Sequence, residues 1–244
     1  MLYWLIKRLL AEPVLTPVLR PWVRGAENVP ASGPAILASN HLSVADTVLL
    51  PTVLRRRVTF IAKAEMFTGA GVRGRLSAGL LRGVGQLPVD RSGGRASAAA
   101  IDAAVEVLGR GEVLGIYPEG TRSPDGRLYR GRTGVARIAL RSGAPVLPVA
   151  MVGTGELMPR GRLVPRVRRV GVVIGEPLDL SRYAGRADDQ FVVRSVTDEI
   201  MAAVQRLSRQ EYVDEYAPRH AADAPPPTPG RGPGGRSAPR PPHR

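Results

Sequence analysis

The sequence predicts an α/β fold with a mainly parallel central sheet flanked by helices. Two observations indicate this fold. Short runs rich in β-branched and other apolar residues recur along the chain, and longer segments with helical spacing of apolar residues lie between them. Strands that alternate with helices are typical of parallel sheets, because each helix returns the chain to the same edge. A chain of 244 residues is long enough for one such domain with a sizeable core.

The pattern gives residue ranges for the individual elements. It predicts strands at residues 35–39, 58–62, 86–89, 113–117, 146–151 and 169–174. It predicts helices at residues 46–54, 95–108, 134–141 and 190–209. Gly109 and Gly111 suit the end of the second helix, because glycine readily adopts the left-handed conformation that terminates helices. The last helix carries an apolar stripe that we expect to face the core, formed by Phe191, Val192, Val196, Ile200, Val204 and Leu207.

The composition excludes some chemistries and favours contact with anions. The chain has no cysteine, which rules out disulfides, thiolate metal ligands and a cysteine nucleophile. Its net charge is +14, and only Lys7 and Lys63 are lysines, so arginine carries nearly all of the positive charge. Arginine suits phosphate and carboxylate partners, which makes nucleic acid, an acidic membrane surface and phosphorylated substrates all candidates. An arginine-rich genomic composition would explain the same bias without any function.

The N-terminal segment, residues 1–23, is rich in large apolar residues. We expect it to begin with an amphipathic helix over residues 2–11 and to bind a membrane interface, because Trp4 and Trp22 favour the headgroup region. Charged residues and three prolines interrupt the segment, so neither a membrane-spanning helix nor a secretory signal is predicted. The alternative is that this apolar face simply packs on the core.

The C-terminal residues 218–244 are rich in proline, glycine and arginine. Such a stretch buries too little apolar surface to fold, and we expect a disordered basic tail. It is either a solvated end without function or an electrostatic tether to anionic lipid. The predicted folded domain is therefore residues 24–217.

Polar clusters directly follow four of the predicted strands. In chain order they are Asn40 with His41, Lys63, Asp90 with Arg91, and the PEGTR run at residues 118–122. Ligands gather at the carboxyl ends of the strands in parallel sheets. We therefore expect the four clusters to converge on one edge of the sheet.

His41 is the one imidazole outside the predicted tail, since the other two histidines are His220 and His243. Asp46 follows five residues later, a spacing that on one continuous helix would turn the two side chains roughly 140° apart. They can meet only if His41 lies on a turn before a helix and Asp46 reaches back from its first turn. Asp46 would then orient the imidazole as a general base. On spacing alone, a plain N-terminal helix acid remains the alternative.

The other candidate residues favour the binding of an anionic substrate over the formation of a covalent acyl-enzyme intermediate. There is no Gly-x-Ser-x-Gly elbow, so direct attack by a substrate hydroxyl is the economical mechanism. In the loop at residues 117–123, Gly120 lets backbone N–H groups approach an anion. Arg122 can clamp a phosphate, while Glu119 can accept from a glycerol hydroxyl or fix an arginine. Each of these residues taken alone is more often a structural turn residue or a solvated charge.

Taken together and in order, these blocks resemble the lysophosphatidic acid acyltransferase family (1-acylglycerol-3-phosphate O-acyltransferases) over residues 22–180. The matching runs are NHLSVAD at 40–46, AKAEMF at 62–67, GQLPVDR at 85–91, YPEGTRS at 117–123 and APVLPVA at 144–150. The RTG run at 132–134 stands where many members have a lysine-rich Lys-x-Gly.

The resemblance implies a role for each matching residue. His41 is similar to the family's general base and Asp46 to its orienting carboxylate. The acceptor's phosphate and glycerol site is implied to consist of Lys63, Arg91, Glu119, Gly120, Thr121 and Arg122. It also implies acyl-CoA or acyl-carrier protein as donor, no metal or other cofactor, and a peripheral or monotopic place on the cytoplasmic face of the cell membrane.

The leading hypothesis is acyl transfer to the sn-2 hydroxyl of a lysophospholipid acceptor, lysophosphatidic acid, which gives phosphatidic acid. The same chemistry on glycerol-3-phosphate, another lysophospholipid, a lyso-ornithine lipid or a glycolipid is the alternative within enzymes. The alternative that is not an enzyme is a basic protein that binds membrane or nucleic acid. Aromatic residues make up only 5% of the chain and no nucleic-acid motif is present, so nucleic acid is not expected as a partner.

Overall fold

The protein folds as an α/β domain built on a seven-stranded sheet, as the sequence predicts. In this computed structural model the described residues are 4, 7, 13, 21–63, 79, 85–89, 94–157, 166 and 169–218. The strands are β1 (Trp22–Arg24), β2 (Ala35–Ser39), β3 (Val58–Lys63), β4 (Gln86–Val89), β5 (Val113–Ile116), β6 (Leu128–Tyr129), β7 (Val146–Val152), β8 (Gly171–Ile174) and β9 (Tyr212–Val213). The helices are α3 (Asp46–Val53), α5 (Gly94–Gly109), α6 (Gly134–Ser142), α7 (Thr154–Leu157) and α8 (Gln190–Ser208).

The order of the strands in the sheet is β1-β8-β7-β2-β5-β3-β4, and it sets side by side the four strands that the predicted polar clusters follow. The four strands β2, β5, β3 and β4 are consecutive neighbours and run parallel, so their carboxyl ends lie side by side. Ala38 of β2 is in register with Ile116 of β5, which sets the residues after the two strands next to each other. Among the described strands of this sheet, β8 runs antiparallel to its neighbour β7, and β1 runs parallel to β8.

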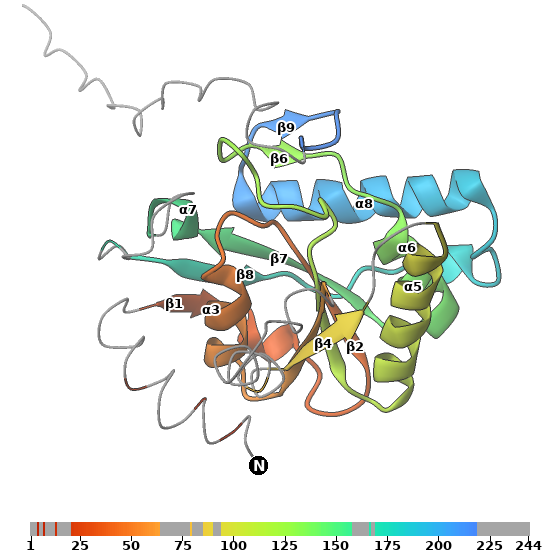
Figure 1. The fold of residues 1–244 in the computed structure, drawn as a ribbon, viewed down its shortest axis with the longest axis horizontal. Coiled ribbons are helices and arrows are strands. Elements are labelled where there is room, and N and C mark those ends of the chain that lie inside the picture. The colour runs from red at the N-terminus through yellow and green to blue at the C-terminus, as the bar shows by residue number, and fades with distance from the viewer. Residues whose placement is uncertain are drawn as a thin grey trace, which may run out of the picture.

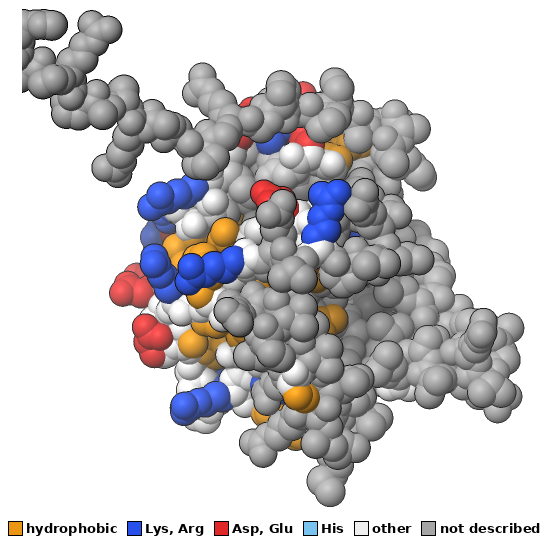
Figure 2. Space-filling model, turned by 90° about the vertical axis from the view of Figure 1, so that its left-hand side faces the viewer, with side chains coloured by type: hydrophobic (Ala, Val, Ile, Leu, Met, Phe, Trp, Pro, Cys, Tyr) orange, Lys and Arg blue, Asp and Glu red, His pale blue; other side chains and the backbone are white. Residues whose placement is uncertain are grey.

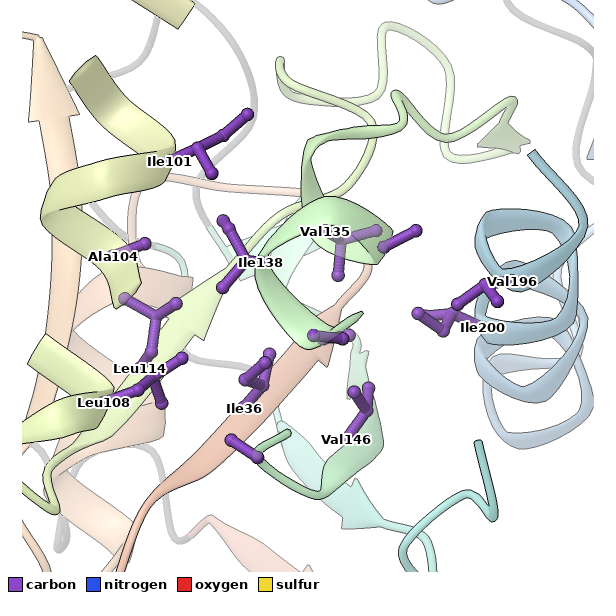
Figure 3. Close-up of a cluster of buried hydrophobic side chains, with 14 of the residues drawn as sticks. Ile36, Ile101, Ala104, Leu108, Leu114, Val135, Ile138, Val146, Val196 and Ile200 are labelled. Carbon is purple, nitrogen blue, oxygen red and sulfur yellow. The ribbon is translucent and has the colours of Figure 1, made fainter. Parts of the chain in front are cut away.

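Helices cover both faces of the sheet (Figure 1). Alternate residues of β2 point to opposite faces, as the two-residue period of a strand requires. Ile36 and Ala38 join the core beneath α5, α6 and α8, whereas Ala35 and Leu37 join the core beneath α3. Figure 3 shows the first of these cores, where side chains from the three helices meet those of the sheet. Burial on both faces explains the continuous apolar runs of the strands.

Two sequence predictions about apolar residues are wrong. Phe191 of the α8 stripe is 87% exposed, because it lies about 100° around the helix from Val192, which faces the core. Trp22 and Val23 do not belong to a separate N-terminal segment but form part of β1, which pairs with β8. The predicted boundary at residue 23 therefore cuts through a strand of the sheet.

The predicted N-terminal helix and basic tail lie outside the described residues, apart from single positions. One of those positions is Lys7, which is buried and donates to the carbonyl of Leu54 at the end of α3. At this point the N-terminal segment contacts the domain. Among the described residues, no helix is both long and apolar enough to cross a membrane.

Gly115, in the middle of β5, allows an aromatic ring to lie directly on the sheet. A methyl group at this position would come within 2.4 Å of the Phe60 ring. We expect Gly115→Ala to lower the free energy of unfolding by about 1–3 kcal/mol, because the added methyl overpacks the core. Urea denaturation measures the effect. Gly109→Ala is the matched control, because a methyl there meets no atom within 4 Å. Equal stability of the two variants would contradict this account of the packing.

Candidate active site

His41 and Asp46 meet in the structure in the way that their spacing requires. His41 lies on the turn after β2, and Asp46 is the first residue of α3. The Nδ1 atom of His41 is 3.0 Å from Oδ2 of Asp46. Asp46 is completely buried, whereas the His41 side chain keeps 15% of its surface exposed. The imidazole is thus fixed on its Nδ1 side and reachable from outside.

The same Asp46 oxygen also organises the turn between the two residues. Oδ2 accepts hydrogen bonds from the backbone N–H groups of Leu42 and Ser43, both at 2.8 Å. A carboxylate that accepts backbone N–H groups ahead of a helix closes a tight turn. The turn therefore holds His41 against Asp46 without relying on the imidazole contact alone.

An aromatic ring supports the imidazole from one side. Tyr117, which follows β5, stacks on His41 with ring centroids 3.9 Å apart and an interplanar angle of 13°. Phe60 of β3 packs behind Tyr117, with centroids 5.5 Å apart. Burial, together with the nearby charge of Asp46, holds the pKa of the Tyr117 hydroxyl well above its usual range. Tyr117 therefore remains neutral and its ring limits the rotation of His41.

Glu119 joins the turn after β2 to the chain after β5, and it is fully buried. Its Oε1 accepts from the backbone N–H of His41 at 3.1 Å, and its Oε2 accepts from that of Tyr129 at 3.0 Å. The sequence-based expectation was a contact with a glycerol hydroxyl or an arginine. In the structure both oxygens instead accept from backbone donors, and Glu119 has no exposed surface at which a glycerol hydroxyl could bind.

Asn40 anchors the other side of His41. Its Oδ1 accepts from the backbone N–H of Met151 at 2.7 Å, and its Nδ2 donates to the Met151 carbonyl at 3.1 Å. Nδ2 also donates to Oε1 of Gln210 at 2.7 Å. The end of β2 is thereby fastened to β7 and to a segment 170 residues further along the chain. Sequence analysis gave Asn40, Tyr117 and Gln210 no role; the polar Asn40 at the end of an apolar strand was the one available signal.

The loop at residues 117–123 continues the site beside His41. The Gly120 N–H donates to the Tyr117 carbonyl at 3.0 Å, and Gly120 has a φ of 75°, which favours glycine. The Ser123 N–H donates to the His41 carbonyl at 2.7 Å, so the loop is tied to the base a second time. Thr121 and Arg122, the two other predicted phosphate contacts in this loop, are both half-buried.

The remaining predicted cations are only partly described. Lys63 is the last residue of β3, two strands from β2, but its side chain is not among those described. Arg91 lies outside the described residues. Within the described part of the chain, no three carboxylate or imidazole groups lie close enough together to hold a metal ion.

Comparison with known proteins identifies the family of this chain. Residues 20–152 match the model of the Acyltransferase family, and the chain belongs to that family. It is 31% identical over 185 residues to the 1-acyl-sn-glycerol-3-phosphate acyltransferase BAT2 of Brassica napus, covering 75% of this chain and 51% of that protein. It is 30% identical over 167 residues to the 1-acyl-sn-glycerol-3-phosphate acyltransferase of Bacillus subtilis, covering 66% of this chain and 75% of that protein. The chain thus spans about half the length of the plant relative.

A solved structure shares the fold. The crystal structure of the 1-acyl-sn-glycerophosphate (LPA) acyltransferase PlsC from Thermotoga maritima superposes with a TM-score of 0.63 at 29% sequence identity. The match covers 84% of this chain and 79% of that one. The mainly parallel sheet flanked by helices is therefore a feature of both proteins.

Glu119 makes the stability of the fold depend on pH. Burial raises the pKa of its carboxyl to about 7 from the ordinary 4.5, the charges of Asp46 and Asp125 add to this, and the two backbone N–H bonds oppose it. Since the folded pKa lies above the unfolded one, the stabilisation is complete below pH 4.5 and is lost as pH rises through 7. We expect the free energy of unfolding to fall by about 2–3 kcal/mol more between pH 5 and 7.5 in the wild type than in Glu119→Gln. Urea denaturation at both pH values measures this change. An equal change in the free energy of unfolding in the two proteins would contradict the account.

Proposed function

We propose that this chain transfers a fatty acyl group from acyl-CoA or acyl-carrier protein to the sn-2 hydroxyl of lysophosphatidic acid, giving phosphatidic acid. The observation that carries the proposal is the His41–Asp46 contact on a turn at the carboxyl edge of the sheet. Membership of the Acyltransferase family supports the reaction class. The 1-acyl-sn-glycerol-3-phosphate acyltransferases of B. napus and B. subtilis, at 31% and 30% identity, support the acceptor.

In the proposed mechanism His41 is the general base. Asp46 holds the Nδ1–H group, and Nε2 takes the proton of the acceptor hydroxyl. At the same time the oxygen of that hydroxyl attacks the carbonyl carbon of the thioester. The C–S bond then breaks, and the leaving thiolate takes up the proton that His41 received. Asp46 stabilises the imidazolium that forms between the two steps. The products are the new ester and the free thiol of the donor.

Direct attack is favoured over an acyl-enzyme intermediate by the state of the nearby serines. Ser39 and Ser43 are both buried, at 1% and 0% exposure. The Ser39 hydroxyl donates to the Asn40 carbonyl at 3.0 Å, and the Ser43 hydroxyl accepts from the Ala45 N–H at 3.3 Å. A serine nucleophile would need its hydroxyl exposed and paired with the base.

The acceptor's phosphate is proposed to bind along the strand ends. The proposed contacts are Arg122, Thr121 and the backbone at Gly120 from the loop after β5, with Lys63 and Arg91 from the neighbouring strands. In this arrangement Glu119 would contribute by fixing the loop against the His41 backbone.

A peripheral position at the cytoplasmic face of a membrane is part of the proposal. Val44 and Val48 are 46% and 39% exposed, so apolar side chains lie on the surface beside the turn that carries His41. Figure 2 shows hydrophobic side chains gathered on one face, with Lys and Arg side chains and some Asp and Glu side chains next to them. An apolar surface bordered by cations suits anionic lipid.

Replacing the base tests the mechanism. We expect His41→Ala to lower kcat by about 10²–10⁴-fold, the usual contribution of a general base, while the urea midpoint changes little. His220→Ala in the tail is the matched control and should retain full activity. The measurement is transfer of labelled acyl-CoA to lysophosphatidic acid. A folded His41→Ala protein with wild-type activity would exclude the mechanism.

The identity of the acceptor needs its own experiment. Purified protein is given labelled acyl-CoA with lysophosphatidic acid, other lysophospholipids, a lyso-ornithine lipid and glycerol-3-phosphate, and the lipid products are separated. We expect the highest kcat/KM on lysophosphatidic acid, because the proposed cationic contacts would bind its phosphate. A higher kcat/KM on any other acceptor would replace lysophosphatidic acid in the proposal and leave the acyl-transfer chemistry in place.

A further inference from the structure

Arg132 lies against the loop after β5, although it is thirteen residues beyond that loop's glutamate, Glu119. Its backbone N–H donates to the Pro118 carbonyl at 2.8 Å. A methyl group at Gly120 would lie 2.9 Å from both Cδ and Nε of Arg132. Glycine at 120 is therefore needed for two reasons: its positive φ and the space that the arginine stem occupies. The loop and the arginine are packed as one unit.

The C-terminal segment, residues 209–217, holds the guanidinium of Arg132 from the other side. The ring of Tyr216 lies 5.0 Å from the guanidinium carbon, within the range of a cation–π contact. Parallel pairing of β9 with β6 fastens this segment, and both strands lie over α8, where Leu128 and Tyr212 pack on Met201 and Val204 (Figure 1). Gln210 in the same segment bonds to Asn40 beside the base.

Among the residues that the structure describes, none neutralises the charge of Arg132. No carboxylate in the described part of the chain forms an ion pair with it. Neighbouring arginines differ: Arg127 pairs with Asp125 at 2.7 Å, and Arg130 approaches Asp214 at 3.6 Å. A half-buried guanidinium that is fixed in place but lacks an anion is suited to bind one from outside.

We propose that Arg132 binds a phosphate monoester of the substrates, with Tyr216 as the positioning residue that holds its guanidinium over Gly120. This rests on the proposed function and adds a cation that the PEGTR loop does not itself contain. Two groups of the substrates are phosphate monoesters that Arg132 could bind: the phosphate of the acceptor and the 3′-phosphate of a CoA donor. The segment at residues 209–217, which lies beyond the matched family region, thereby becomes part of the active site.

The test compares Arg132→Ala and Arg132→Lys with a matched arginine elsewhere. Arg110→Ala is the control, because it also removes one positive charge but lies before β5, at the opposite end of that strand. Two soluble probes report phosphate binding as competitive inhibitors: glycerol-3-phosphate for the acceptor site and adenosine 3′,5′-bisphosphate for the CoA site.

We expect Arg132→Ala to lower kcat/KM by about 10- to 100-fold, the effect of losing a charge-assisted hydrogen-bond pair, and to raise the Ki of one probe by a similar factor. The probe whose Ki rises identifies the source of the phosphate. Arg132→Lys should recover part of the loss, because lysine keeps the charge without the planar fork. Arg110→Ala should leave both Ki values unchanged.

Tyr216 variants separate positioning from folding. Tyr216→Phe keeps the ring and should keep the wild-type Ki, whereas Tyr216→Ala should raise the same Ki that Arg132→Ala raises. The proposal is overturned if neither Ki rises in Arg132→Ala beyond the change in Arg110→Ala. It is also overturned if Tyr216→Ala binds both probes as the wild type does. Probe binding and the activity of His41→Ala are separate measurements. If Arg132→Ala raised a Ki while His41→Ala remained active, the phosphate site would be supported and the general-base mechanism would be excluded.

Discussion

The rest of the site depends on one buried oxygen, Oδ2 of Asp46. It accepts from the His41 imidazole at 3.0 Å and from the N–H groups of Leu42 and Ser43 at 2.8 Å. Losing the carboxylate would leave these donors unsatisfied, at a cost of about 1–3 kcal/mol for each one that stays buried. The oxygen thus fixes both the shape of the turn and the orientation of the base, so structural and chemical roles share one atom.

The position of that turn follows from the topology of the sheet. Because β2 and β5 are parallel neighbours, the turn after β2 and the loop after β5 come together, and Glu119 fastens one to the other through the His41 N–H. The stack that continues through Tyr117 to Phe60 rests on a strand where Gly115 leaves room for the ring. The packing of the core therefore supports the imidazole through aromatic contacts. For this reason a methyl group added to β5 would disturb the site as well as the core.

Local pattern was sufficient to predict most of the fold. The range 35–39 for the first predicted strand and 86–89 for the third agree with β2 and β4, because both are short, mainly apolar runs bounded by turn residues. The spacing of His41 and Asp46 also predicted a turn at His41, since a continuous helix cannot join them. What failed depends on tertiary context. A strand of three residues is too short to carry a pattern from which the pairing of Trp22 with Gly171 could be predicted. The exposure of Phe191 depends on where α8 begins.

The supporting contacts of the site were beyond sequence reasoning for a related reason. Glu119 looked like a substrate contact because its type and neighbours suit one, but only the fold brings the N–H groups of His41 and Tyr129 to its two oxygens. Gln210 reaches Asn40 across 170 residues, and no local signal marks such a pair. Residue type predicted the chemistry of the site, whereas long-range packing decided which side chains support it.

The proton on His41 provides the most direct test of the account. Because Asp46 accepts from Nδ1, the neutral imidazole should carry its proton on Nδ1 and leave Nε2 free to take a proton from a hydroxyl. Nitrogen-15 NMR of the ring in the full chain distinguishes the two tautomers, with the His41 signals assigned by their loss in His41→Ala. The account predicts the Nδ1–H tautomer for the neutral ring. A predominant Nε2–H tautomer would contradict it, because the base would then have no free nitrogen on its exposed side.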